Sequence, residues 1–148
     1  MSNLEIRIRV AAVIIENNKI LLIAHQKDNA VYWLLPGGGV NPGESLEEAL
    51  KRELKEELDI YVNVDDVALI CDSIAPDNSK HILNICFFCS HNTGNYLLNH
   101  EQRLYSFGFY EVDALDKLQI FPPIKNELKE ILRGLKNSIY QGKKWVNQ

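Results

Sequence analysis

Hydrophobic and polar residues alternate along several segments of the chain, and a period of two is typical of β-strands with one buried face. The first such segment, residues 5–10, alternates isoleucine and valine with glutamate and arginine, and an apolar run continues it to Ile15. The same criteria predict further strands over residues 20–24, 60–64, 67–75, 81–90 and 104–112. We therefore expect the fold to contain a β-sheet.

Turns between these strands are marked by asparagine, proline and polar residues. The pair Asn17-Asn18 predicts a tight hairpin turn, because asparagine tolerates a left-handed backbone. The segment Pro76–Ser79 predicts a second turn, and residues 25–31 are expected to form a polar loop.

Two segments show the spacing of about 3.6 residues that is typical of amphipathic helices. Residues 46–58 contain neither glycine nor proline, and Ser45 with Glu48 forms a capping box at the start of this predicted helix. A second helix is predicted to begin at the proline pair 122–123, with apolar residues at helical spacing as far as Ile139. This order of strands and helices predicts an α/β fold with a mixed sheet covered on both sides.

Length and composition limit the kinds of protein to consider. The chain of 148 residues is assigned to a single domain, with its core at about 5–139 and a C-terminal tail at 140–148, where Trp145 suggests a docking contact. The hydrophobic content of 46% is ordinary for globular proteins. The net charge of −4 argues against a general nucleic-acid binder. Neither a signal peptide nor a membrane span is predicted, so the cytoplasm is the expected location.

The three cysteines, Cys71, Cys86 and Cys89, are an odd number, which argues against a disulfide framework. Cys86 and Cys89 form a C-x-x-C pair, which could indicate redox or zinc chemistry. They lie within an apolar strand, however, where positions i and i+3 point to opposite faces. Buried free cysteines are therefore predicted.

The helix predicted over residues 46–58 combines an apolar stripe with a cluster of acidic side chains. The apolar stripe has one residue at every fourth position and consists of Leu46, Leu50, Leu54 and Leu58. A neighbouring stripe carries carboxylates at positions i, i+3 and i+4, namely Glu53, Glu56 and Glu57. Arg52 flanks this stripe, and Glu44 lies just before the helix, where its carboxylate can reach the same side.

Two interpretations of this acidic cluster are open. In a solvated face, the repulsion between neighbouring carboxylates costs only some tenths of a kcal/mol per pair. In a cleft, two carboxylates about 5.5 Å apart repel by roughly 3 kcal/mol at an effective dielectric near 20. A divalent cation such as Mg²⁺ or Mn²⁺ relieves that repulsion. The adjacent glycines Gly37, Gly38 and Gly39 favour the cleft, because an exposed backbone can meet both a phosphate and a metal.

Residues 38–60 resemble the Nudix box, G-x5-E-x7-R-E-U-x-E-E-x-G-U, in which U is a bulky apolar residue. Eight of the nine defined positions are filled in register, by Gly38, Glu44, Arg52, Glu53, Leu54, Glu56, Glu57 and Ile60. Asp59 stands at the last glycine, directly after the helix, where a left-handed backbone is usual. Aspartate tolerates that conformation at a cost of about 1 kcal/mol, so this departure concerns local stability more than chemistry.

The resemblance implies a Nudix-type α/β/α sandwich with a mixed β-sheet. It also implies hydrolysis of a phosphoanhydride bond in a nucleoside diphosphate linked to another group. By the same resemblance, Mg²⁺ or Mn²⁺ is held by Glu53, Glu56 and Glu57, with Glu44 and a backbone carbonyl near Gly37 assisting. Arg52 orients these carboxylates, and the three glycines contact the substrate. Glu53 and Glu101, which lies in a loop outside the box, are alternative catalytic bases, and an ordinary exposed loop glutamate is the other interpretation of Glu101.

The identity of the small-molecule nucleotide substrate is open at this point. Pro76 stands sixteen residues after Ile60, a position associated within the family with ADP-ribose hydrolases, although a turn explains this proline equally well. MutT-like hydrolysis of nucleoside triphosphates, dinucleoside polyphosphates or capped ends, and a non-catalytic nucleotide sensor are the alternatives. Many relatives are dimers, so a homodimer is also open. Base stacking and core packing are alternative roles for four aromatic residues, Tyr32, Trp33, Phe88 and Tyr110.

Overall fold

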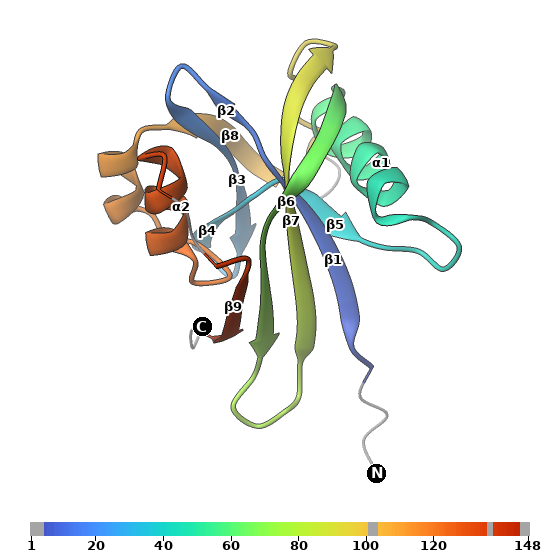
Figure 1. Cartoon of the computed structure of the whole chain (residues 1–148), viewed down its shortest axis with the longest axis vertical. Helices are drawn as coiled ribbons and strands as arrows, with labels where there is room; N and C mark the ends of the chain where they lie inside the picture. The colour runs from blue at the N-terminus through green and yellow to red at the C-terminus, as the bar shows by residue number, and fades with distance from the viewer. Residues whose placement is uncertain (1–4, 101–103, 136–137, 146–148) are drawn as a thin grey trace.

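The structure is a computed structural model that describes residues 5–100, 104–135 and 138–145 (Figure 1). Within these residues two β-sheets lie between helix α1 and helix α2 (Figure 1). The strands are β1 (Arg7–Val13), β2 (Ile15–Glu16), β3 (Lys19–Lys27), β4 (Ala30–Leu34), β5 (Gly37–Gly39), β6 (Tyr61–Ile74), β7 (His81–Thr93), β8 (Leu104–Tyr110) and β9 (Tyr140–Lys144). The helices are α1 (Leu46–Leu58), the 3₁₀ helix η2 (Val112–Lys117) and α2 (Lys125–Leu132). None of the helices in the described residues is long and apolar enough to cross a membrane.

The larger sheet is mixed, as predicted, with the strand order β5-β1-β7-β6-β9. Strand β1 runs parallel to β7, and β6 runs parallel to β9, while β1 pairs with β5 and β6 with β7 in the antiparallel sense. In the smaller sheet, β3 pairs with β2, β4 and β8, all antiparallel. The larger sheet carries the glycine-rich strand β5 at one edge and the C-terminal strand β9 at the other.

Both faces of β1 are buried from Val10 to Val13, which explains the continuous apolar run in this half of the strand. Val10 and Ala12 pack into one hydrophobic cluster with the leucines of α1, and Ala11 and Val13 pack into a second cluster with α2 and η2. The alternation of side chains along the strand thus assigns each residue to one of two cores. The resulting arrangement is the α/β/α sandwich that the sequence predicted.

Helix α1 has the predicted bounds and the predicted caps. The side chain of Ser45 accepts a hydrogen bond of 3.0 Å from the backbone N–H of Glu48, and Leu50, Leu54 and Leu58 are fully buried. Asp59 ends the helix in the left-handed region, with φ 56° and ψ 37°. The missing glycine of the box is therefore replaced by a residue that adopts the same backbone conformation.

Two asparagine-containing turns shape the smaller sheet. Asn17 and Asn18 both have positive φ values, of 51° and 64°, which confirms the predicted hairpin turn. The polar loop predicted over residues 25–31 is wrong, because β3 and β4 continue to a two-residue turn at Asp28 and Asn29, whose φ values are 51° and 66°. The polar residues of this segment lie at the end of a hairpin, where its side chains are exposed or only partly buried.

Two strands of the larger sheet, β6 and β5, also differ from the sequence prediction. The strands predicted over residues 60–64 and 67–75 form one strand, β6, because a bulge between Val64 and Val67 absorbs the polar interruption. The glycine segment 37–39, for which no strand was predicted, builds β5, which pairs with β1 as an edge strand. An edge strand requires pairing along only one side, so a glycine segment can occupy it.

The C-terminal region departs most from the prediction. Helix α2 ends at Leu132, and Gly134 follows with φ 74°, so the predicted continuation of the helix to Ile139 is wrong. Residues 140–144, which the sequence assigned to the tail, form β9 parallel to β6. The apolar residues after Leu132 continue the helical spacing by chance. Periodicity alone therefore cannot show that the helix ends at Leu132.

The conformation of Asp59 gives a stability prediction. Asp59→Gly removes the β-carbon from a left-handed position, which is worth about 1 kcal/mol, and loses only a solvent-exposed ion pair with Lys55. We expect a melting temperature that is unchanged or raised by a few degrees in thermal unfolding followed by circular dichroism. Asp59→Val, which is β-branched, should lower it, and the reverse order of the two variants would contradict the backbone assignment.

Candidate active site

The acidic stripe of α1 faces the edge strand β5. Glu57 is buried, with only 4% of its surface exposed, and its Oε1 accepts a hydrogen bond of 2.8 Å from the backbone N–H of Gly37. Strand β5 is held in place by pairing with β1, where Gly37 lies opposite Ala11 and Gly39 opposite Arg9. The buried carboxylate is therefore fixed to the backbone of the glycine strand.

The pKa of Glu57 is raised to about 8, mainly by burial and to a smaller extent by the nearby carboxylates of Glu53 and Glu56. The positive charge of Arg9 and the hydrogen bond from Gly37 act in the opposite direction and lower the pKa. The charged form of Glu57 is thus disfavoured both by loss of water and by repulsion from its neighbours. A bound cation would relieve both effects.

Gly38 leaves the space that the Glu53 carboxylate occupies. A β-carbon at position 38 would lie 2.2 Å from Cδ of Glu53 and within 2.5 Å of both its carboxylate oxygens. The absence of a side chain at Gly38 therefore lets this carboxylate lie directly against the backbone. At Gly39, by contrast, a β-carbon would meet no atom within 4 Å. Of these two neighbouring glycines, only Gly38 must lack a side chain for the Glu53 carboxylate to fit.

Arg52 connects the carboxylates with one another. Its guanidinium binds both oxygens of Glu44, with Nε–Oε2 at 2.7 Å and Nη2–Oε1 at 2.8 Å. It also donates to Oε1 of Glu53 at 2.8 Å, to Oε2 of Glu56 at 3.5 Å and to the carbonyl oxygen of Gly39 at 3.0 Å. These contacts raise the pKa of Arg52, and the guanidinium is the main cause that lowers the pKa of Glu44 to about 2.

The donors of this cluster fit a divalent cation in their chemistry. Glu44, Glu53, Glu56 and Glu57 supply hard carboxylate oxygens, which Mg²⁺ and Mn²⁺ prefer. The space at Gly38 and the repulsion around Glu57 are the two structural observations that support this fit. In the described part of the chain, no three acidic, histidine or cysteine side chains already converge on one point as a metal site would require. Instead, Arg52 binds three of the four carboxylates.

The structure brings most of the predicted site residues together. Arg52 links Glu44, Glu53, Glu56 and the backbone of Gly39, and Glu57 binds Gly37, as described above. Glu101, the predicted alternative base, lies outside the described residues. The three cysteines are free and buried, with Cys86 and Cys89 in the two different cores, as their spacing predicted.

A pocket beside the acidic cluster contains residues that sequence analysis did not single out. It has a volume of about 210 Å³ and is lined by residues that include Arg9, Ser73, Lys80, Asn84 and Phe121. Arg9 belongs to both regions, because it lines the pocket while its charge acts on Glu57. Arg9 alternates with apolar residues in β1, and this pattern predicts only a solvated strand face, so the sequence offered no means of recognising its role.

The aromatic residues considered for base stacking divide between core and pocket. Trp33 packs edge-on against Tyr110, with ring centroids 5.0 Å apart, and both contact the core beside α2. Tyr32 lines the pocket, whereas Phe88 is partly exposed and is absent from the described residues that line it. Trp145, which the sequence suggested as a docking contact, also lines the pocket.

The sequence matches a known domain family and, over part of its length, several curated proteins. A sequence model of the NUDIX domain matches residues 6–133. The chain is 46% identical over 52 residues to the nucleoside triphosphatase NudI of Enterobacter sp. (strain 638), covering 33% of this chain and 37% of that protein. For NudI of Salmonella arizonae the identity is 40% over 62 residues, covering 39% and 44%. The chain thus aligns with less than half the length of these curated relatives.

Solved structures resemble the whole fold. The MutT NUDIX hydrolase from Burkholderia pseudomallei is 27% identical and matches 85% of this chain and 97% of its own, with a TM-score of 0.73. A NUDIX hydrolase from Nitrosomonas europaea has a TM-score of 0.76 at 21% identity, over 88% and 90% of the two chains. An ADP-ribose pyrophosphatase from Streptococcus suis has a TM-score of 0.68 at 20% identity, over 96% and 100%. The last two comparisons establish similarity of fold alone.

The two glycines provide a matched test of the acidic cluster. Gly38→Ala should displace the Glu53 carboxylate, because the new β-carbon occupies its place, and should weaken Mn²⁺ binding about tenfold or more in isothermal titration calorimetry. The carboxylate is the flexible end of a side chain, so the melting temperature should change little. Gly39→Ala, which adds a β-carbon in open space, should leave both quantities near the wild-type values. Equal Mn²⁺ affinity in the two variants would refute the role of Gly38.

Proposed function

Because this chain belongs to the Nudix family, we propose that it is a nucleotide pyrophosphohydrolase, which cleaves a phosphoanhydride bond in a nucleoside diphosphate linked to another group. One observation carries the proposal, namely the acidic stripe of α1 fixed against the glycine strand by Glu57 and Gly37 and by the close approach of Glu53 to Gly38. A purely structural helix would have no need for a buried carboxylate at this position, since an unneutralised buried charge destabilises the fold.

We propose that Glu53, Glu56 and Glu57 hold Mg²⁺ or Mn²⁺, with Glu44 and the carbonyl near Gly37 as further ligands. The cation would supply neutralisation of the anhydride's negative charge, which otherwise repels a nucleophilic oxygen. The N–H of Gly37 orients Glu57 for this role. The space at Gly38 does the same for Glu53.

Arg52 is proposed as the residue that orients the acidic cluster. Its two bonds to Glu44 and its bond to Glu53 fix the direction in which these carboxylates point. Its charge also balances part of theirs. The proton acceptor for the attacking water is proposed to be Glu53 or Glu101, and Glu53 is the one whose carboxylate borders the glycine strand in the described structure.

Nucleoside triphosphates are the substrate class that we propose first. The curated relatives with 40–46% identity over their aligned residues are named nucleoside triphosphatases, whereas the neighbour named an ADP-ribose pyrophosphatase is 20% identical. ADP-ribose-like sugar nucleotides are the second candidate, supported by the position of Pro76, although Pro76 also begins an ordinary turn. A sensor that binds without cleaving would have no use for the complete set Glu53, Glu56 and Glu57.

We propose that the protein acts in the cytoplasm. The cytoplasm contains the nucleotide pool and keeps thiols reduced, which agrees with three free cysteines. A homodimer is proposed by analogy with the family and is to be tested by the molecular mass in solution.

Glu57→Gln tests the proposed metal site. Removal of one anionic ligand should lower kcat by a factor of 100 or more with Mg²⁺ present. Because burial already disfavours the charged form of Glu57, the neutral amide should not lower the melting temperature. Glu47→Gln on the same helix is the control, since Glu47 is exposed and pairs with Lys51 at 3.3 Å. Unchanged turnover in Glu57→Gln would exclude Glu57 as a ligand.

A substrate panel tests the reaction itself. The purified protein is incubated with Mg²⁺ and with nucleoside triphosphates, ADP-ribose or dinucleoside polyphosphates, and the products are separated by chromatography. We expect a nucleoside monophosphate and pyrophosphate from a triphosphate, and no product when Mg²⁺ is removed by EDTA. Binding of nucleotides without cleavage of any member of the panel would favour the sensor.

A further inference from the structure

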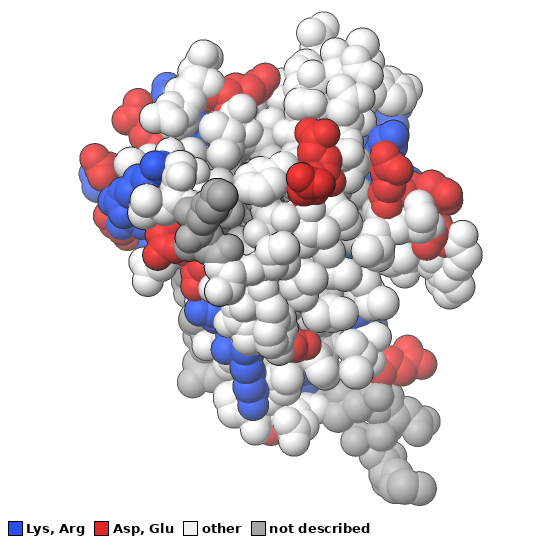
Figure 2. Space-filling view, in the orientation of Figure 1, with Lys and Arg blue, Asp and Glu red and all other residues white. Residues whose placement is uncertain are grey.

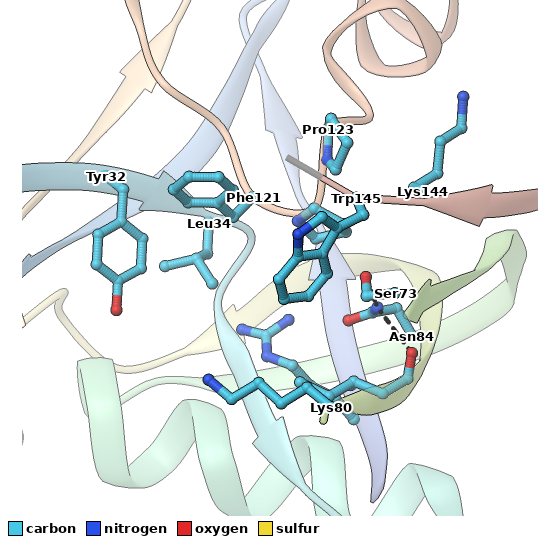
Figure 3. A pocket seen from close by; sticks show the side chains of 12 residues that line it. Tyr32, Leu34, Ser73, Lys80, Asn84, Phe121, Pro123, Lys144 and Trp145 are labelled. Atoms are coloured by element: carbon cyan, nitrogen blue, oxygen red, sulfur yellow. Dashed lines mark hydrogen bonds between the residues drawn. The ribbon is translucent and has the colours of Figure 1, made fainter. Parts of the chain in front are cut away.

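The pocket beside the acidic cluster is open to one side and has walls of different chemical character. Phe121, Leu34 and Tyr32 provide apolar and aromatic surface, and Ser73 and Asn84 provide polar groups (Figure 3). Its volume of about 210 Å³ is below the roughly 300–1,000 Å³ of pockets that enclose drug-sized ligands. The pocket therefore suits one flat ring system better than an entire nucleotide.

Trp145 extends into this pocket from the end of β9 (Figure 3). Figure 3 shows its indole between Leu34 and Phe121 on one side and Ser73 and Asn84 on the other. Residues 134–145 lie beyond the residues matched by the family's sequence model, which end at 133. Trp145 thus lies outside the residues on which the family assignment rests.

Strand β9 is fixed to the sheet by contacts that also place Trp145. The backbone N–H of Ile70 donates to the carbonyl oxygen of Ile139 at 2.8 Å, and the hydroxyl group of Tyr140 donates to Asp72 at 2.6 Å. At the other end of the strand, Lys144 pairs with Glu127 of α2 at 2.9 Å. The position of the indole is therefore determined by a strand anchored at both ends.

The polar wall presents an oriented hydroxyl group. Asn84 and Ser73 are 3% and 7% exposed, and Nδ2 of Asn84 donates to Oγ of Ser73 at 2.9 Å. Because Oγ accepts this bond, the hydrogen of Ser73 is available to donate to another acceptor. A ring nitrogen or carbonyl oxygen at the edge of a nucleobase is such an acceptor.

The charged residues that line the pocket are all positive. They are Arg9, Lys80 and Lys144, and no acidic residue is among the described residues that line it. In a chain with a net charge of −4, this local excess of positive charge favours an anionic ligand. Arg9 also lies close enough to Glu57 for its charge to lower the carboxylate's pKa, so an anion held here would lie beside the acidic cluster.

We propose that this pocket binds the nucleobase of the substrate, with the ring stacked on Trp145 and its edge accepting a hydrogen bond from Ser73. Strand β9 then supplies a specificity element of the enzyme. Arg9 and Lys80 hold the negative charge of the attached phosphates. This inference rests on the proposed nucleotide hydrolysis for its ligand class, but its binding part can be measured without catalysis.

The first experiment compares substrates with and without a base in Trp145→Ala. Loss of a stacking ring should raise KM for a nucleoside triphosphate by about 10- to 100-fold, with kcat little changed. For ribose 5-triphosphate, which has no base, KM should be the same as in the wild type. Trp145→Phe should restore most of the lost affinity. Lys143→Ala, an exposed position on the same strand that is not among the residues lining the pocket, is the control for damage to β9.

Ser73→Ala separates the edge contact from stacking. Loss of one neutral hydrogen bond should raise KM for nucleoside triphosphates about 2- to 10-fold. The same change should reduce the difference in KM among bases, and KM for ribose 5-triphosphate should not change. An equal rise for every substrate, the base-free one included, would indicate a structural role and would overturn this part of the proposal.

Nucleotide binding measured in the presence of EDTA tests the base-pocket proposal separately from the proposal of hydrolysis. Addition of a nucleoside monophosphate should quench the fluorescence of Trp145, and Trp145→Ala should abolish the quenching while Trp33 remains as the internal reference. Quenching in EDTA, together with no hydrolysis of any member of the substrate panel by the wild type in Mg²⁺, would support the base pocket and refute the enzymatic proposal. Hydrolysis that is unaffected by Trp145→Ala, with no base-dependent quenching, would refute the pocket and leave the reaction intact.

Discussion

The site depends on the close contact between one face of a helix and three glycines of an edge strand. Glu57 is buried and bound to the backbone of Gly37, and Glu53 occupies the space that a side chain at Gly38 would fill. Both contacts require that α1 and β5 stay in fixed register. The buried leucines of α1 maintain the position of the helix, and the pairing of β5 with β1 maintains that of the strand. The hydrophobic core thus sets the geometry of a charged cluster at its border.

Arg52 also holds the acidic cluster together, because it binds three of its carboxylates. In Figure 2, which shows one face of the molecule, several acidic and basic side chains lie close to one another over α1. Within the cluster, the single guanidinium of Arg52 contacts Glu44, Glu53, Glu56 and the carbonyl of Gly39. A planar group with five donors can do this, whereas a lysine ammonium cannot match both oxygens of Glu44. A cation that enters the cluster must therefore compete with Arg52 for carboxylate oxygens.

The sequence predicted those features that are encoded locally. Helix α1, its cap at Ser45 and the left-handed Asp59 follow from residues within one or two turns of one another. The acidic stripe followed from helical spacing. The pairing of β9 with β6 joins Tyr140 to Ile70, and no local pattern specifies such a distant partner. The pocket escaped prediction for the same reason, since Arg9, Ser73, Asn84 and Trp145 come from four strands or strand ends and meet only in the folded chain.

The position of β9 at the margin of the sheet has a consequence for how such proteins diverge. Among the strands that the structure describes, β9 has one neighbour, β6, so it can change in sequence or length without disturbing the interior of the sheet. Glu53 and Glu57 lie on α1, toward the opposite margin (Figure 1). If a residue carried by this marginal strand contacts the base while the residues of α1 break the bond, selection can alter ligand preference while the chemistry is conserved. New specificities would then arise at low risk to folding.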